Sequence, residues 1–182
     1  MEQIEKWLTE KQLIKGTVYQ FPVDVIELIR SQTCNEPAIF GNDGYYRNNA
    51  CHYNSLLFSQ EFKIDNTENR IIEGIVVCEE DGYIFDHFWN RIVFNEEVFM
   101  DYDVANAFSN AESKIIVDVE NKIVNKSYYE YCNHSISDIN NRLQELLPQI
   151  ENVIKEYYNN HPEHKERYYS EKEILKQQMR YD

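Results

Sequence analysis

Apolar and polar residues alternate along this chain with a spacing that changes from segment to segment, and each spacing predicts a kind of secondary structure. At the start of the chain apolar residues recur every three or four positions, which predicts a helix over residues 2–15 that Gly16 ends. We expect a turn over residues 19–22 and a second short helix over residues 24–31. The polar segment 33–49, which contains a proline and two glycines, predicts a loop.

The middle of the chain predicts one helix followed by three strands. The helix runs from Cys51 to about residue 62 and has an apolar stripe along one side. Strong turn signals at Asp81-Gly82 and Asn95-Glu96 separate the strands, so we expect an antiparallel meander. The predicted strands cover residues 71–78, 83–94 and 97–102.

The last third of the chain predicts a hairpin and then helices. The hairpin covers residues 115–124, with its turn at Glu120-Asn121. From Ser137 apolar residues return to helical spacing, and Pro148 inside that run predicts a kink or a break. Residues 159–182 are polar with balanced charge, which is typical of an exposed helix or a partly disordered tail.

Together these elements predict an α+β fold: a short antiparallel sheet, the Cys51 helix packed on it, and helices at both ends of the chain. The length of 182 residues is sufficient for one sizeable core. We expect residues 1–135 to form the α+β core with its N-terminal helices. Residues 136–182 are expected to form a C-terminal helical extension of the same domain.

The chain carries a formal net charge of -14. Binding to nucleic acid or to an anionic membrane needs basic residues, so this charge disfavours both. A protein or peptide substrate with basic residues would complement this charge, and the simpler interpretation is that the charge serves solubility. No apolar segment is typical of a signal peptide or long enough to cross a bilayer. We therefore expect a cytoplasmic protein, with signal-independent secretion left open.

Cys51 is the first candidate for chemistry, because it lies where the polar loop enters the predicted helix. The first turn of a helix has unpaired N–H groups and the positive end of the helix dipole, which stabilise a thiolate. The other cysteines, Cys34, Cys78 and Cys132, form no CxxC pair, so neither a disulfide framework nor a metal site is expected. A thiol nucleophile needs no cofactor, and we expect none.

A histidine and an aspartate follow Cys51 on the predicted strands. His87 lies in the middle strand, and Asp101 ends the apolar run of the next strand. The order Cys, His, Asp, with the last two on neighbouring strands, is that of a thiol triad. In such a triad the thiol attacks an acyl carbon, the imidazole moves its proton, and the carboxylate orients the imidazole.

Residues 41–104 resemble the papain-like and transglutaminase-like superfamily of cysteine enzymes. The run His87-Phe88-Trp89-Asn90 is similar to the His-Ala-Trp motif of transglutaminase-like proteins. His87 follows Cys51 by only 36 positions, a compact spacing that resembles bacterial protein-glutaminases and small deamidase effectors. The resemblance implies a papain/transglutaminase-like fold and a peptidase, glutamine deamidase or transglutaminase activity.

The register of the two strands decides which aspartate faces His87. A two-residue loop puts Asp101 on the opposite face from His87. A three-residue loop centred on Asn95 puts Asp103 across from His87 and Asp101 across from Trp89, all on one face. We prefer Asp101, because it follows an apolar run as the acid does in the superfamily, and Asp103 remains the alternative.

Other polar residues near Cys51 have weaker roles. The N–H of Cys51 and a second donor from the preceding loop, Asn48 or Asn49, would hold an oxyanion. His52 follows Cys51 directly, so on a helix it points about 100 degrees away and is a poor base. Cys132 and His134 form a second Cys/His pair, but two ligands make a weak metal site.

The leading functional hypothesis is a cysteine-dependent hydrolase that acts on an amide carbonyl, either a peptidase or a protein-glutamine deamidase, through a thioester. The alternative is a non-enzymatic acidic protein, either an immunity-type inhibitor or a mimic of nucleic acid. This alternative rests on the net charge and on an acidic cluster in which only Arg91 is basic. The cluster comprises Glu79, Glu80, Asp81, Asp86, Glu96, Glu97, Asp101 and Asp103.

Overall fold

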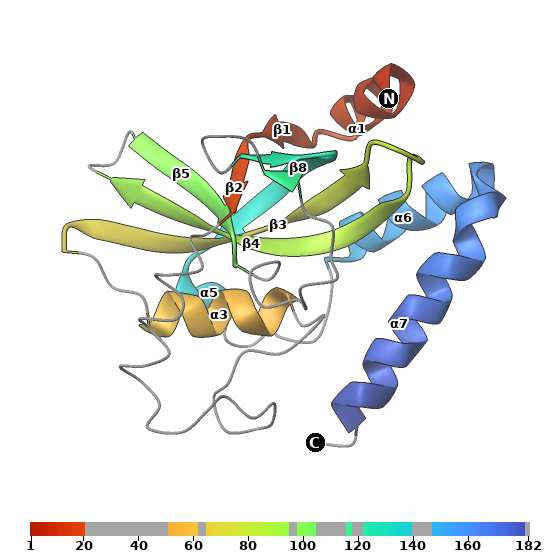
Figure 1. The fold of residues 1–182 in the computed structure, drawn as a ribbon. Helices are drawn as coiled ribbons and strands as arrows, with labels where there is room; N and C mark the ends of the chain where they lie inside the picture. Colours follow the sequence, from red (N-terminus) through yellow and green to blue (C-terminus); the bar gives the residue numbers. More distant parts are fainter. Residues whose placement is uncertain are drawn as a thin grey trace.

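The fold is mixed α+β, with a six-stranded sheet at its centre (Figure 1). The computed structural model describes residues 1–20, 51–61, 65–94, 98–104, 116–117, 122–139 and 147–180. The helices are α1 (Glu2–Glu10), α3 (Cys51–Glu61), α5 (Ile136–Ile139), α6 (Pro148–Asn160) and α7 (Lys165–Arg180), with a 3₁₀ turn at Pro162–His164. The strands are β1 (Ile14–Gly16), β2 (Val18–Gln20), β3 (Thr67–Cys78), β4 (Ile84–Phe94), β5 (Val98–Asp103), β6 (Ile116–Val117), β7 (Ile123–Val124) and β8 (Lys126–His134).

The main sheet is curled. Its strands lie in the order β1-β8-β3-β4-β5-β2, in which β3, β4 and β5 form an antiparallel meander and β2 runs parallel to β5. β1 and β2 lie at opposite edges, although only Thr17 separates them in the chain. Consecutive Cα atoms are only about 3.8 Å apart, so the two edges must approach each other.

The two faces of the sheet bury different cores. One face packs against the helices: Leu8 of α1 and Ile150 of α6 share a cluster with Ile75, and Leu56 of α3 packs in a second cluster. The other, inner face of the curl holds a smaller aromatic and aliphatic cluster centred on Trp89. The remaining buried members of that cluster are Val18, Ile72, Val76, Ile123 and Tyr128.

The C-terminal helix α7 is anchored to the sheet by a buried polar contact. Tyr168 donates a hydrogen bond to Asp86 on β4 at 2.8 Å, and Lys172 binds the same carboxylate. Tyr168 also packs against Tyr158 of α6. α7 is therefore docked onto β4 through Tyr168 and Lys172. Its other side chains from Lys165 to Glu173 are exposed, so the predicted exposed helix is confirmed.

Several predicted elements are confirmed. The helix that starts at Cys51, the three strands of the meander and the small hairpin are all present in the described residues. Pro148 marks a break, because it is the first residue of α6 and lacks the N–H that this position does not need. The predicted helix over residues 24–31 and the loop over residues 33–49 lie outside the described residues.

Two predictions for the N-terminal segment are wrong. The helix ends at Glu10, because Gln12 takes a positive φ of 67° and redirects the chain into β1. Ile14, expected on the helix, is 66% exposed at the sheet edge, and Tyr19 lies in β2 and not in a turn.

Strand β8 was missed, although its tyrosines suit a strand. Among the described helices, none is long and apolar enough to cross a membrane.

Gly74 on β3 permits the close packing beneath the inner cluster. A Cβ atom there would lie 2.1 Å from the backbone oxygen of Tyr129 and 2.7 Å from the ring of Trp89. Gly74 also follows a register shift between β3 and β8 and pairs with His87 on β4. A larger residue would therefore push apart the strands that position His87.

We predict that Gly74→Ala lowers the free energy of unfolding by about 1–3 kcal/mol, the usual cost of overpacking. Urea denaturation followed by circular dichroism measures this loss. Gly16→Ala is the matched control, because the nearest atom to its new Cβ is an Asp101 oxygen at 3.8 Å. Equal stability of the two variants would contradict the packing role of Gly74.

Candidate active site

α3 is fixed on β4 by hydrogen bonds that the Asn90 side chain of the strand donates to the helix. The Asn90 amide donates hydrogen bonds to the backbone oxygen of Ser55 at 2.9 Å and to Ser59 Oγ at 2.8 Å. Phe58 is fully buried in the same helix. These contacts hold the first residue of α3, Cys51, beside Phe88 of β4.

His87 lies on the inner face of the curled sheet, 6% exposed and enclosed by aromatic rings. Its ring stacks near Trp89 and meets the edges of Phe85 and Tyr128, with centroids between 5.7 and 6.4 Å apart. Among the described residues, β5 pairs with β4 only from Asn90 onward. At the start of α3, the Cys51 thiol forms a hydrogen bond with the His87 imidazole.

The thiol of Cys51 and the imidazole of His87 shift each other's ionisation. Burial raises the pKa of Cys51, but the charge of His87 and hydrogen bonds from His52 and His87 outweigh it and lower the pKa to about 6. Burial lowers the pKa of His87, yet the charges of Asp103 and Cys51 raise it to about 10. At neutral pH the pair is therefore a thiolate beside an imidazolium.

Asp103 is the carboxylate that contacts His87. The His87 Nε2–Asp103 Oδ2 distance is 2.8 Å, and the Tyr128 hydroxyl donates to the same oxygen at 2.6 Å. Asp103 is fully buried, which by itself raises its pKa, but the His87 charge and these hydrogen bonds lower it. With Nε2 on Asp103, the nitrogen that can exchange a proton with Cys51 is Nδ1.

Asp101, the preferred third member in the sequence analysis, does not contact His87. It accepts two hydrogen bonds from Arg91, at 2.6 and 2.8 Å, and one from Trp89 Nε1 at 3.1 Å. Arg91 also pairs with Glu130 on β8. The expected contact between Asp101 and His87 is therefore wrong, and the alternative residue Asp103 takes that place.

The strand register explains this correction. Phe94 pairs with Val98, so three residues separate the strands, as one of the two proposed loops required. The loop lies one position further along than expected, which places Asp101 across from Arg91. The same register, continued by one pair, places Asp103 across from Trp89 and diagonal to His87.

His52 was expected to point away from the thiol, and this expectation is wrong. A hydrogen bond from His52 and its charge both lower the pKa of Cys51. Its ring also meets the edge of Phe88, at 6.0 Å between centroids. The thiol thus lies between two histidines. The side chains of neighbouring helix residues point in directions about 100 degrees apart. The His52 side chain is nevertheless long enough to reach the Cys51 thiol at the first turn of the helix.

The remaining predicted residues are placed as follows. Asn48 and Asn49, the candidates for a second oxyanion donor, lie outside the described residues. Tyr128 was not predicted as part of the site, because no motif signals a tyrosine from β8 beside Asp103. Cys132 and His134 lie on β8 and form a cluster with Glu73 of β3. This cluster does not include Cys51.

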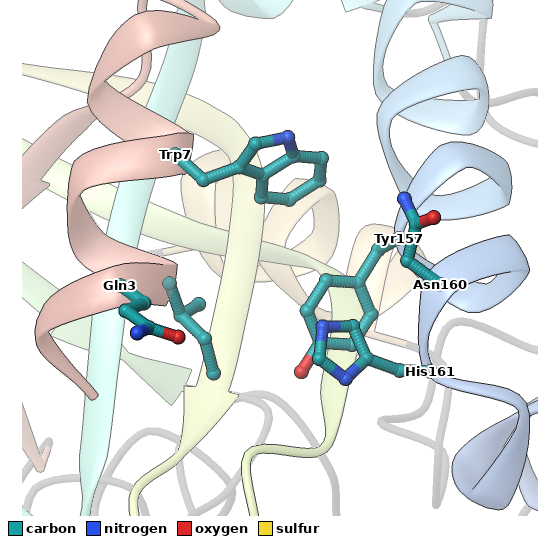
Figure 2. A pocket seen from close by; sticks show the side chains of 6 residues that line it. Gln3, Trp7, Tyr157, Asn160 and His161 are labelled. Carbon is teal, nitrogen blue, oxygen red and sulfur yellow. The ribbon is translucent and has the colours of Figure 1, made fainter.

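A small cavity lies elsewhere, between α1 and α6 (Figure 2). Its volume is about 220 Å³. Trp7 and Tyr157 face each other across it, and His161 stacks on Tyr157 with centroids 4.2 Å apart. The lining residues in the described part of the chain include no thiol or carboxylate, so we assign the candidate chemistry to Cys51 and not to this cavity.

Comparisons with known proteins give no match: no family model, no curated protein and no solved structure is significantly similar to this chain.

We predict that alkylation of Cys51 by iodoacetamide is half-maximal near pH 6, because the thiolate forms there. His87→Ala should move the midpoint toward the ordinary thiol value of 9.0, and His52→Ala should move it less. Peptide-resolved mass spectrometry measures each cysteine separately. Cys78, whose pKa is raised by burial, is the internal control. An unchanged profile in His87→Ala would refute the ion pair.

Proposed function

We propose that this protein is a cysteine-dependent hydrolase that acts on an amide carbonyl, with Cys51 as nucleophile, His87 as acid and base, and Asp103 as the orienting carboxylate. The observation that carries the proposal is the pairing of a low-pKa thiol with a high-pKa imidazole that is itself bound to a buried carboxylate. Such shifted, mutually dependent pKa values are typical of catalytic pairs and less common in structural histidines. The papain/transglutaminase-like resemblance is part of this proposal.

In the acylation step the Cys51 thiolate attacks the carbonyl carbon, and the carbonyl electron pair moves to oxygen. The N–H of Cys51, the first residue of α3, has no acceptor within the helix, so it is the donor assigned to this oxyanion. When the oxyanion collapses, the C–N bond breaks and the leaving amine takes a proton from His87 Nδ1. The products of this step are a thioester on Cys51 and a neutral imidazole.

Deacylation reverses these roles. Neutral His87 removes a proton from water, and the resulting hydroxide adds to the thioester carbonyl. Collapse of the second oxyanion breaks the C–S bond and restores the thiolate and the imidazolium. The first product is a new amino terminus if the substrate is a peptide bond, and ammonia if it is a glutamine side chain.

Asp103 and Tyr128 act on the imidazole and not on the substrate. The Asp103 carboxylate holds the Nε2–H of His87 and stabilises its cationic form. Tyr128 fixes that carboxylate from β8 with a short hydrogen bond. Both contacts lie on the inner face of the curl, where Trp89 helps to exclude water.

The alternative, an acidic binding protein, has less support from the structure. Asp86, Asp101 and Asp103 are buried and bonded within the chain, so they do not contribute to an exposed acidic surface. α7 also supplies two cations to this region, because Arg167 pairs with Asp81 and Lys172 pairs with Asp86. In the sequence itself, Arg91 is the one Lys or Arg within the acidic cluster of residues 79–103.

We expect Asp103→Asn to slow turnover by about 100- to 10,000-fold, the usual range for lost acid–base assistance. Casein and short glutamine-containing peptides are the substrates, assayed for new amino termini and for ammonia, with Cys51→Ala as the inactive reference. Either product supports the proposal and identifies the reaction.

Asp101→Asn is the matched control, because Asp101 binds Arg91 and not His87. It should reduce stability without the loss of turnover. The opposite pattern, with Asp101→Asn inactive and Asp103→Asn active, would restore the original assignment. Absence of both products from all substrates, together with slow alkylation of Cys51, would refute the proposal.

The pH profile of kcat/KM should be bell-shaped. Below about pH 6 the Cys51 thiol is protonated and cannot attack, so activity falls as pH falls through that value. Above about pH 10 His87 loses the proton that the leaving amine needs, so activity falls as pH rises through that value. Initial rates measured at low substrate concentration test this, and a profile with no acid limb would contradict it.

A further inference from the structure

A second group of reactive side chains lies at the junction of β3 and β8. Glu73 comes from β3, and Cys132 and His134 are two positions apart on β8, so their side chains share one face of that strand. The register pairs Glu73 directly with Cys132. Among the described residues, this is the one group of three or more His, Cys, Asp or Glu side chains whose ligand atoms all lie within 4.8 Å of one another.

The three donor atoms converge on one point. His134 Nε2 lies 3.1 Å from Cys132 Sγ and 2.9 Å from Glu73 Oε2. In a nucleophile–base–acid arrangement the two ring nitrogens would contact different partners, but here a single nitrogen faces both groups. This convergence is the arrangement of ligands around a shared cation.

We propose that Glu73, Cys132 and His134 form a metal site that selects Zn²⁺. Thiolate, imidazole and carboxylate are all zinc ligands, and three protein ligands leave one tetrahedral position for water or another molecule. A thiolate and a carboxylate together carry two negative charges, which one Zn²⁺ neutralises. This neutralisation favours the metal in a site where Glu73 is only 1% exposed.

The geometry requires little movement. Zinc–ligand bonds of about 2.0–2.3 Å at tetrahedral angles place neighbouring donor atoms roughly 3.3–3.7 Å apart. The two separations from His134 Nε2, 3.1 and 2.9 Å, are shorter by less than 1 Å, and the third, between the Cys132 and Glu73 ligand atoms, is at most 4.8 Å. Small side-chain movements therefore admit the ion.

Metal binding here would also connect the sheet to the C-terminal helices. Glu73 Oε1 accepts a hydrogen bond at 2.8 Å from the backbone N–H of Leu147, the residue that precedes α6. The other oxygen, Oε2, faces the proposed ion. An ion that fixes Glu73 therefore orders the start of α6 and raises the melting temperature of the protein.

Cobalt titration of the 182-residue protein tests the site, because a thiolate bound to Co²⁺ gives a charge-transfer absorption in the near ultraviolet. All variants carry Cys51→Ala, which removes the thiol proposed for catalysis and makes the result independent of the proposed function. After treatment with a chelator, the Cys51→Ala protein should bind one Co²⁺ per chain with this absorption, and Zn²⁺ should displace it.

Adding Cys132→Ser should abolish the absorption, and adding Cys78→Ser, a matched control at the end of β3, should leave it unchanged. His134→Ala should weaken binding by more than the ~10- to 100-fold typical of losing an outer-shell partner. His134 lies nearer the surface than Glu73, so this variant tests the site at less risk to folding, which circular dichroism checks. Zn²⁺ should raise the melting temperature only where Cys132 is retained.

An unchanged absorption in the Cys132→Ser variant would overturn the proposal, because another thiol would then be the ligand. Absence of saturable Co²⁺ binding to a folded Cys51→Ala protein would overturn it as well.

Discussion

The closure of the curled sheet is the constraint on which the rest of the structure depends. One residue, Thr17, connects strands at the two opposite edges, so the sheet folds on itself and encloses a second core. The residues of that inner core are buried, and a charged group there is stable only if a partner balances it. His87 and Asp103 meet this condition as a buried ion pair completed by Tyr128.

The same enclosure gives Cys51 its chemical character. Water would weaken the effect of an exposed histidine's charge on a nearby thiol. A histidine that a buried carboxylate keeps positively charged lowers the pKa of that thiol more strongly. The start of α3 brings that thiol within hydrogen-bond reach of His87. The proposed hydrolase chemistry thus depends on packing as much as on the identity of the three residues.

Two adjacent residues of β3, Glu73 and Gly74, contribute to different sites on the two faces of the sheet. His87 pairs with Gly74 on the inner face, and the adjacent Glu73 points to the helix-covered face, where it meets His134 and the start of α6. Gly74 lets the inner aromatic rings approach β3 closely, and the register shift beside it sets the position of Glu73. A short segment of β3 therefore supports both the candidate active site and the proposed metal site.

The sequence alone determined the helix at Cys51, the three-strand meander and the fact that Asp101 and Asp103 lie on one face of their strand, because local periodicity encodes each of these. It could not choose between the two aspartates, since both lie on one face and the register depends on contacts across the sheet. Tyr128, Glu73 and His52 were beyond prediction for a related reason. Their roles come from β8 pairing with β3 and from the packing of α3 on β4, which are contacts between distant segments that no local pattern specifies.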